Sequence, residues 1–176
     1  MPKRSKENIE NDTLEIIKVF QNNARVSFND LADKTGFSRQ KIWRIIKSLE
    51  KNKTIWGYTT IIDENKQNLT NFIVLVKKNT TPLDEKTLDL VISRELDELA
   101  KKIGVEVESS LFVHGEYDWV LSITAKNIKQ VKKFCEVFYK LYNQHVSKLH
   151  ILENLFTIKK QKILNPNSKN IKKFIS

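Results

Sequence analysis

The chain has 176 residues and a formal net charge of +10, and 40% of its residues are hydrophobic. This length and composition suit one medium domain or two small ones with a packed core. No stretch approaches the roughly 18 consecutive apolar residues of a membrane-spanning helix. The basic start, MPKRSKENIEND, has no apolar segment behind it and so does not resemble a secretory signal. We therefore expect a cytoplasmic protein that does not interact with a membrane.

The chain has few residues that could form a catalytic, redox or metal site. The single cysteine, Cys135, excludes an internal disulfide, and its apolar neighbours predict a buried thiol. His114, His145 and His150 lack the spacing of metal ligands, and the chain has neither a glycine-rich phosphate loop nor a nucleophile motif. We expect no metal, no cofactor and no enzymatic activity.

The first predicted helix begins at Asp12, which is followed three positions later by Glu15 in the pattern of a capping box. It ends near Asn22, and its apolar face is Leu14, Ile17 and Phe20. A second, short helix is predicted to begin at Ser27, again with an acidic residue three positions on, and to end at Gly36. Its predicted buried residues are Phe28, Leu31 and Ala32.

After only two further residues the chain has another N-cap residue, Ser38, and a third helix is predicted to run to about Lys51. Apolar residues recur on one face of this helix at spacings of three and four, namely Ile42, Ile45, Ile46 and Leu49. Three helices with a tight turn before the third predict a helix-turn-helix.

The excess positive charge lies at the two ends of the chain. Residues 1–60 carry 12 Lys or Arg and 7 Asp or Glu, residues 61–160 carry 15 and 14, and residues 161–176 carry 4 and none. Such a distribution is typical of a polyanion-binding module with a basic tail. A generally basic proteome is the alternative explanation.

The outer face of the third helix is where DNA contacts are predicted. Arg and Gln near the start of a recognition helix can pair with guanine and adenine edges, and Lys suits phosphate oxygens. Between Ser38 and Ser48 the chain has four cations and no acid, with Lys51 just beyond. The alternative is an ordinary solvated helix face. Trp43 is predicted either to stack on the sugar-phosphate backbone or to pack against Trp56. The predicted contacts on this helix are Ser38, Arg39, Gln40, Lys41, Trp43, Arg44 and Lys47.

The second half alternates strands and helices. Residues 55–62 are rich in β-formers and predict a strand, either a small wing or a strand that docks on a partner subunit. The further predicted elements are strands at 72–76, 105–113, 119–124 and 148–158 and helices at 83–103 and 128–145. The order βαββαβ is that of a ferredoxin-like unit, a four-stranded antiparallel sheet with both helices on one face. In the longer helix we expect Leu88, Ile92, Leu96 and Leu99 to face inward.

The predicted fold class is therefore α+β, with four segments. They are a winged helix-turn-helix (1–62), a polar linker (63–70), a ferredoxin-like dimerisation and effector domain (71–160) and a weakly ordered basic tail (161–176). The face of the sheet without helices has to be covered, and face-to-face dimerisation would cover it.

An ordered set of residues runs through both halves of the chain: Asp12, Ile16, Ile17, Gln21 to Arg25, Ser27, Leu31, Ala32, Gly36, Ser38, Ile42, Ile46, Leu49, Glu50, Ile55, Gly57, Tyr58 and Asp63, and then Gly115 to Leu121. In this set, and over nearly its whole length, the chain resembles the Lrp/AsnC, or feast/famine, family of transcription regulators, archaeal type. The family pattern has Arg where this chain has Ile45 and Gly where it has Lys53, and its effector helix is shorter. The resemblance adds Arg25 and Ser27 to the predicted DNA contacts.

The resemblance implies a winged helix-turn-helix that binds double-stranded DNA, joined to an effector domain (a RAM domain) that forms homodimers. It also implies assembly into tetramers or octamers and a small-molecule effector such as an amino acid. The candidate effector residues are His114, Gly115, Tyr117 and Asp118, for which a plain turn between strands is the alternative. Two other functions stay open: an architectural protein that coats DNA with little sequence preference, and a tetrapyrrole (sirohaem) decarboxylase-like enzyme on the same scaffold.

Overall fold

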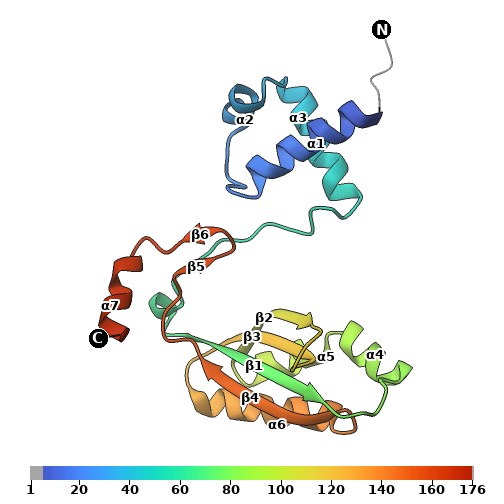
Figure 1. Ribbon diagram of the computed structural model, residues 1–176, viewed down its shortest axis with the longest axis vertical. Coiled ribbons are helices and arrows are strands. Elements are labelled where there is room, and N and C mark those ends of the chain that lie inside the picture. Colours follow the sequence, from blue (N-terminus) through green and yellow to red (C-terminus); the bar gives the residue numbers. More distant parts are fainter. Residues whose placement is uncertain (1–5, 176) are drawn as a thin grey trace. The chain divides into compact units, whose positions relative to one another are not determined.

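The computed structural model describes residues 6–175, which form two compact units. The first unit comprises the chain up to Ile61 together with Lys159–Pro166. The second comprises Ile62–Ile158 together with the chain from Asn167 onward. Figure 1 shows helices in the first unit and an antiparallel sheet with its helices in the second. None of the described helices has the length and apolar character needed to cross a bilayer.

The helices of the first unit are α1 (Lys6–Phe20), α2 (Phe28–Thr35) and α3 (Arg39–Lys51). They pack around the buried side chains of Ile16, Leu31, Ile42 and Ile46. The predicted start of the first helix is wrong, because α1 begins six residues before Asp12. Its core residue is Ile16, whereas Leu14 is 52% exposed. Asp12 does not cap the helix; its carboxylate lies 2.7 Å from the ammonium group of Lys41 on α3.

The boundaries of α2 and α3 follow the predicted caps. The Ser27 hydroxyl accepts a hydrogen bond from the Asp30 amide (3.1 Å) and the Ser38 hydroxyl accepts one from the Lys41 amide (3.3 Å). Gly36 ends α2 with φ 67°, a left-handed conformation that glycine adopts without steric cost. The prediction that Phe28 is buried is wrong, since its side chain is exposed at the first position of α2.

The strand predicted at residues 55–62 is absent. This segment has no ladder partner among the described residues, and β-forming side chains cannot make a strand without a neighbouring edge. Lys53, where the family pattern has Gly, has φ 63°. The linker is not wholly irregular, because it contains a 3-10 helix, η1 (Glu64–Gln67), capped by Asp63.

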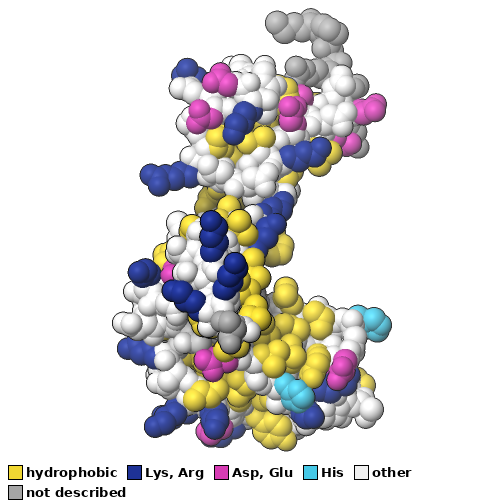
Figure 2. Space-filling view, turned by 60° about the vertical axis from the view of Figure 1, so that its left-hand side comes forward, with side chains coloured by type: hydrophobic (Ala, Val, Ile, Leu, Met, Phe, Trp, Pro, Cys, Tyr) yellow, Lys and Arg dark blue, Asp and Glu magenta, His cyan; other side chains and the backbone are white. Residues whose placement is uncertain are grey.

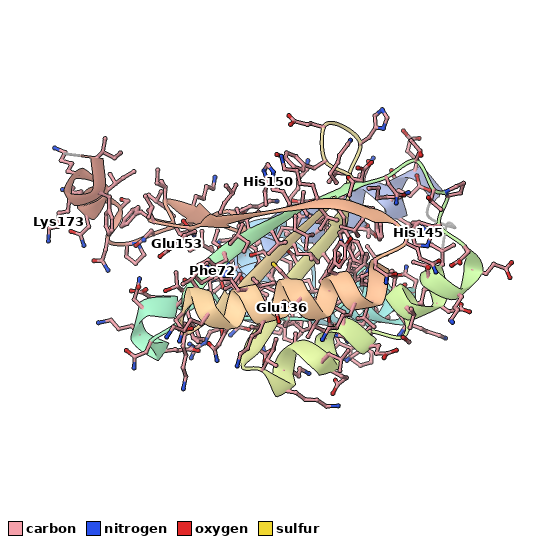
Figure 3. All side chains as sticks on the ribbon, turned by 90° about the horizontal axis from the view of Figure 1, so that it is seen from below. Phe72, Glu136, His145, His150, Glu153 and Lys173 are labelled. Atoms are coloured by element: carbon pink, nitrogen blue, oxygen red, sulfur yellow. The ribbon has the colours of Figure 1, made fainter. Side chains whose placement is uncertain are left out.

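The second unit is built on four antiparallel strands in the order β2-β3-β1-β4, the ferredoxin-like order. Their bounds are β1 (Thr70–Lys78), β2 (Val105–Phe112), β3 (Trp119–Ala125) and β4 (Val146–Glu153). In Figure 3 α6 (Ile128–Tyr142) lies along one side of the sheet, with Phe72 between them, and His150 lies on the other side. Phe72, Val74 and Val76 of β1 are buried on the helical side, together with Phe134 and Phe138 of α6.

The single helix predicted for residues 83–103 is wrong. Two helices occupy this span, α4 (Glu85–Ile92) and α5 (Glu95–Lys102), separated at Arg94, which has φ 61°. The break changes which positions face the sheet: Leu96 is buried, as predicted, whereas Leu88 is exposed and Ile92 is 76% exposed. No Gly or Pro in the span signals the break. The Arg94 guanidinium donates two hydrogen bonds to Asp97 (2.9 and 2.8 Å), which holds the junction.

The tail predicted to be weakly ordered contains regular structure. The strand β4 ends at Glu153, five residues before the predicted end. A short hairpin follows, β5 (Lys159–Lys160) and β6 (Ile163–Leu164), whose two turn residues both have positive φ. Beyond it lie a 3-10 helix, η2 (Ser168–Ile171), and α7 (Lys172–Ile175). The Phe174 ring lies 5.3 Å from that of Phe156, so the end of the chain packs on the segment after β4.

Candidate nucleic-acid interface

The tight turn between α2 and α3 sets the orientation of the third helix. The Thr35 hydroxyl donates to the Leu31 carbonyl (2.7 Å) and accepts from the Phe37 amide (3.3 Å), so the turn satisfies its own polar groups. Below it, Ile42, Ile46 and Leu49 are buried on the inner face of α3. The opposite face of α3 is therefore free to meet a partner.

Four of the predicted contacts on α3 have exposed side chains without a partner in the described chain. Gln40 and Arg44 lie four residues apart on the outer face, and Arg39 and Trp43 flank them. Neither Arg39 nor Arg44 forms an ion pair or a side-chain hydrogen bond with a described residue. Two guanidinium groups are thus available for bidentate hydrogen bonds to phosphate or to a guanine edge.

Lys41 departs from the predicted set. Its ammonium group forms the ion pair with Asp12 and lies 3.1 Å from the centre of the Phe37 ring, and its side chain is only 19% exposed. This lysine joins α3 to α1 and to the turn. We therefore leave Lys41 out of the proposed DNA contacts.

Lys47 is exposed but has a partner. Its ammonium group donates to the Glu50 carboxylate at 2.7 Å, and the Tyr58 hydroxyl donates to the same carboxylate at 2.9 Å. The hydrogen bonds from Lys47 and Tyr58 lower the pKa of Glu50 from its ordinary value. Glu50 and Tyr58 were not among the predicted site residues. The i, i+3 spacing of Lys47 and Glu50 could have predicted their ion pair, whereas nothing local in the sequence predicts the contact of Glu50 with Tyr58.

Trp43 does not pack against Trp56. Trp56 is 95% exposed, so no described side chain stacks on it, and Trp43 is half exposed on α3. Of the two predicted roles for Trp43, only an external contact such as stacking on the sugar-phosphate backbone remains. Arg25 and Ser27, before and at the start of α2, are also exposed.

The candidate effector residues lie between β2 and β3. Asp118 accepts a hydrogen bond from the Lys78 amide (2.9 Å), which lowers the pKa of its carboxyl group, and lies 3.4 Å from the Lys77 ammonium. The Tyr117 hydroxyl lies 3.0 Å from Nδ1 of His150 on β4. His114 and Gly115 are exposed. Asp118 therefore supports the turn. His150 lies near the candidate effector residues only because β1 pairs with β4, and no local sequence signal predicts that pairing.

The first unit matches a family model described as winged helix-turn-helix DNA-binding, over residues 13–55. An uncharacterized HTH-type transcriptional regulator of Pyrococcus furiosus is 32% identical over 68 residues, which are 39% of this chain and 46% of that protein. A triosephosphate isomerase of Wigglesworthia glossinidia brevipalpis is 29% identical over 119 residues, which are 60% of this chain and 43% of the isomerase. The chain spans less than half the length of either protein.

Solved structures match almost the whole chain. The AsnC family transcriptional regulator from Agrobacterium tumefaciens has a TM-score of 0.62 at 19% identity and covers 89% of this chain and 96% of its own. The feast or famine regulatory protein from M. tuberculosis, complexed with L-methionine, has a TM-score of 0.64 at 18% identity. The match covers 92% of this chain and 100% of the M. tuberculosis chain. The triosephosphate isomerase fold is a barrel of eight parallel strands, which the antiparallel sheet of this chain does not share.

These findings define the class of the protein. Its first unit contains a helix-turn-helix that matches a winged model over residues 13–55, so the match reaches only the first residue of the segment 55–62, in which the predicted wing strand is absent. The whole chain has the fold of the Lrp/AsnC transcription regulators, which confirms at the level of the fold the resemblance found in the sequence.

Proposed function

We propose that the protein is a sequence-specific, DNA-binding transcription regulator. The observation that carries this proposal is the outer face of α3, where Arg39, Gln40 and Arg44 are exposed without partners among the described residues, on a helix fixed by its buried face. In this proposal α3 enters the major groove, while Lys47, Ser38, Ser27 and Arg25 meet the phosphate backbone. A dimer would read two half-sites about 34 Å apart or a multiple of that distance.

The test is binding of the full chain to genomic DNA fragments, including the promoter of its own gene, against random competitor DNA at fixed salt. Tight binding that resists competitor and weakens with salt supports a sequence-specific regulator. Binding that the competitor abolishes supports the architectural alternative instead. Neither the comparisons nor the described residues favour the tetrapyrrole enzyme; an absorbance band of a bound pigment in the purified protein would revive it.

We further propose that the open face of the sheet forms a homodimer. Leu111, Val120, Leu75 and His150 are neighbours in one row across the four strands, on the side away from the helices. Ile73 and Leu152 are cross-strand neighbours in the next row, and Leu111 and Leu152 are exposed. Figure 2 shows hydrophobic side chains gathered on one face of this unit. Covering an apolar face of this kind removes it from water and so stabilises the assembly that covers it.

Sedimentation velocity tests the dimer. Leu111→Asp places a charge at the β2 end of the row, on an exposed position of the apolar face, and should yield monomers. Leu88→Asp is the matched control, because Leu88 is similarly exposed but lies on α4. If both variants dissociate to the same extent, or if neither variant dissociates, this interface is contradicted.

An amino acid is the proposed effector class. Its support is the L-methionine complex of the M. tuberculosis protein and the exposed turn at His114 and Gly115, next to the Tyr117–His150 pair. Isothermal titration with each of the common amino acids tests it. Tyr117→Phe removes the hydroxyl and should weaken binding, while Tyr139→Phe, an exposed tyrosine on α6, should not. Unchanged binding in Tyr117→Phe would remove this turn from the effector site.

A further inference from the structure

The second unit contains an open cavity of about 590 Å³ where α5 ends and α6 begins. Its wall includes Lys102, the last residue of α5, and Gly104 just beyond it, with Asn127, Lys129, Gln130 and Lys133 around the first turns of α6. None of these residues belongs to the recognition helix or to the candidate effector turn. The cavity is of the size that small-molecule sites usually have, and three of its lining side chains carry a positive charge.

No described carboxylate forms an ion pair with the ammonium groups in this cavity. Lys102, Lys129 and Lys133 form no ion pair with a described carboxylate, whereas the adjacent Lys101 lies 3.5 Å from Glu98. The charge is also locally concentrated: residues 61–160 carry 15 basic and 14 acidic side chains, but residues 126–133 carry four lysines and no acid. Like charges lining one concavity repel each other and attract an anion.

Gln130 adds an oriented donor to the cavity. Its side-chain carbonyl accepts a hydrogen bond from the Lys126 amide at 2.8 Å, which fixes the carboxamide group. Its Nε2 lies against Gly104, where an added Cβ would collide with it, and Gly104 has φ 75°. Nε2 has no acceptor among the described residues. The cavity thus combines a held amide donor with three ammonium groups.

We propose that this cavity binds a small phosphate-bearing polyanion with two or more negative charges, a class that includes inorganic pyrophosphate and nucleotide polyphosphates. Phosphate oxygens accept charge-assisted hydrogen bonds from lysine, and a ligand with several phosphates can reach more than one of the ammonium groups. The concave shape favours a small ligand over a duplex. This site goes beyond the proposed DNA-binding function and does not depend on it.

The experiment is isothermal titration of the full chain with sodium pyrophosphate and with ATP, at low and high salt. The expected result is saturable binding that weakens as salt rises. Lys129→Ala with Lys133→Ala should lower the affinity by about tenfold or more, because two charge-assisted contacts are lost. Lys132→Ala is the control for one of these two substitutions: it removes one positive charge from the same helix outside the cavity, and the affinity should stay within about twofold of the wild type.

Gln130→Glu provides a second, nearly isosteric variant. It keeps the carbonyl that accepts from Lys126 but replaces the donor with a negative oxygen, so it should also weaken binding without disturbing the fold. Absence of saturable binding to both probes overturns the proposal, as does an equal loss in Lys132→Ala. If the Lys129 and Lys133 variant lowers affinity for DNA but not for pyrophosphate, these lysines contact DNA and the small-ligand site is refuted.

Discussion

Removing the guanidinium group of Arg44 tests the recognition face most directly. Arg44 is exposed on the outer face of α3 and forms no ion pair or hydrogen bond with a described residue. Truncation to alanine therefore leaves no buried partner unsatisfied, and alanine has the highest helix propensity. We expect the free energy of unfolding to change little, so that the whole effect falls on DNA binding. The same argument applies to Arg39, at the first position of α3.

The size of the effect follows from the contact that is lost. A bidentate arginine contact with a base edge contributes about 1–3 kcal/mol of discrimination. Loss of one such contact should weaken operator binding by about 5- to 150-fold. Affinity for random DNA should fall less, because only the phosphate attraction of one charge is lost. The ratio of specific to non-specific affinity should therefore drop.

The assay is a fluorescence anisotropy titration with the operator and with random duplex of the same length, at one salt concentration. Lys18→Ala is the matched control, because Lys18 is an exposed cation of the same unit on α1. Thermal melts of each variant establish that the fold is retained. Operator affinities at the wild-type level for both arginine variants, or a loss in Lys18→Ala as large as theirs, would refute the assignment of α3 as the recognition helix.

Four further predictions concern other parts of the chain. Glu50→Gln frees Lys47 and removes a negative charge from α3 itself, so affinity for any duplex should rise a few-fold in the same titration; an unchanged or lower affinity contradicts a phosphate role for Lys47. Lys53→Gly removes the strain of a lysine with positive φ and should raise the free energy of unfolding by about 0.5–1 kcal/mol in urea melts. A lower free energy of unfolding would contradict this. Burial raises the pKa of the Cys135 thiol to about 11, so its alkylation at pH 8 should be far slower in the native protein than in denaturant; equal rates would show an accessible thiolate. The four lysines of the tail are Lys162, Lys169, Lys172 and Lys173. Replacing them by glutamine should weaken binding to all DNA sequences alike and lower the slope of log affinity against log salt by up to about 3.6, or 0.9 for each phosphate contact. An unchanged slope would show that the tail does not contact DNA.

The sequence by itself determined the features that depend on local chemistry. Ser27 and Ser38 cap helices because a short side-chain oxygen reaches an amide three residues on, and Gly36 ends α2 because glycine tolerates positive φ. The order of strands and helices was also readable, since alternation and helical spacing follow from burial of one face. These signals were enough to predict the helix-turn-helix and the ferredoxin-like sheet.

Only the tertiary structure decided how particular side chains are used. Lys41 has the spacing of a surface residue, yet Asp12 and Phe37 draw it between helices. Residues 55–62 have the composition of a strand, but strand formation needs a second edge, which the described chain does not supply. Arg94 breaks the predicted long helix through a backbone conformation that no glycine or proline announces. The Lys41–Asp12 ion pair and the pairing of a strand edge join residues far apart in the sequence, so local patterns could not predict them. The break at Arg94 is local, with its guanidinium bonded to Asp97, but it lacks the Gly or Pro that would signal it.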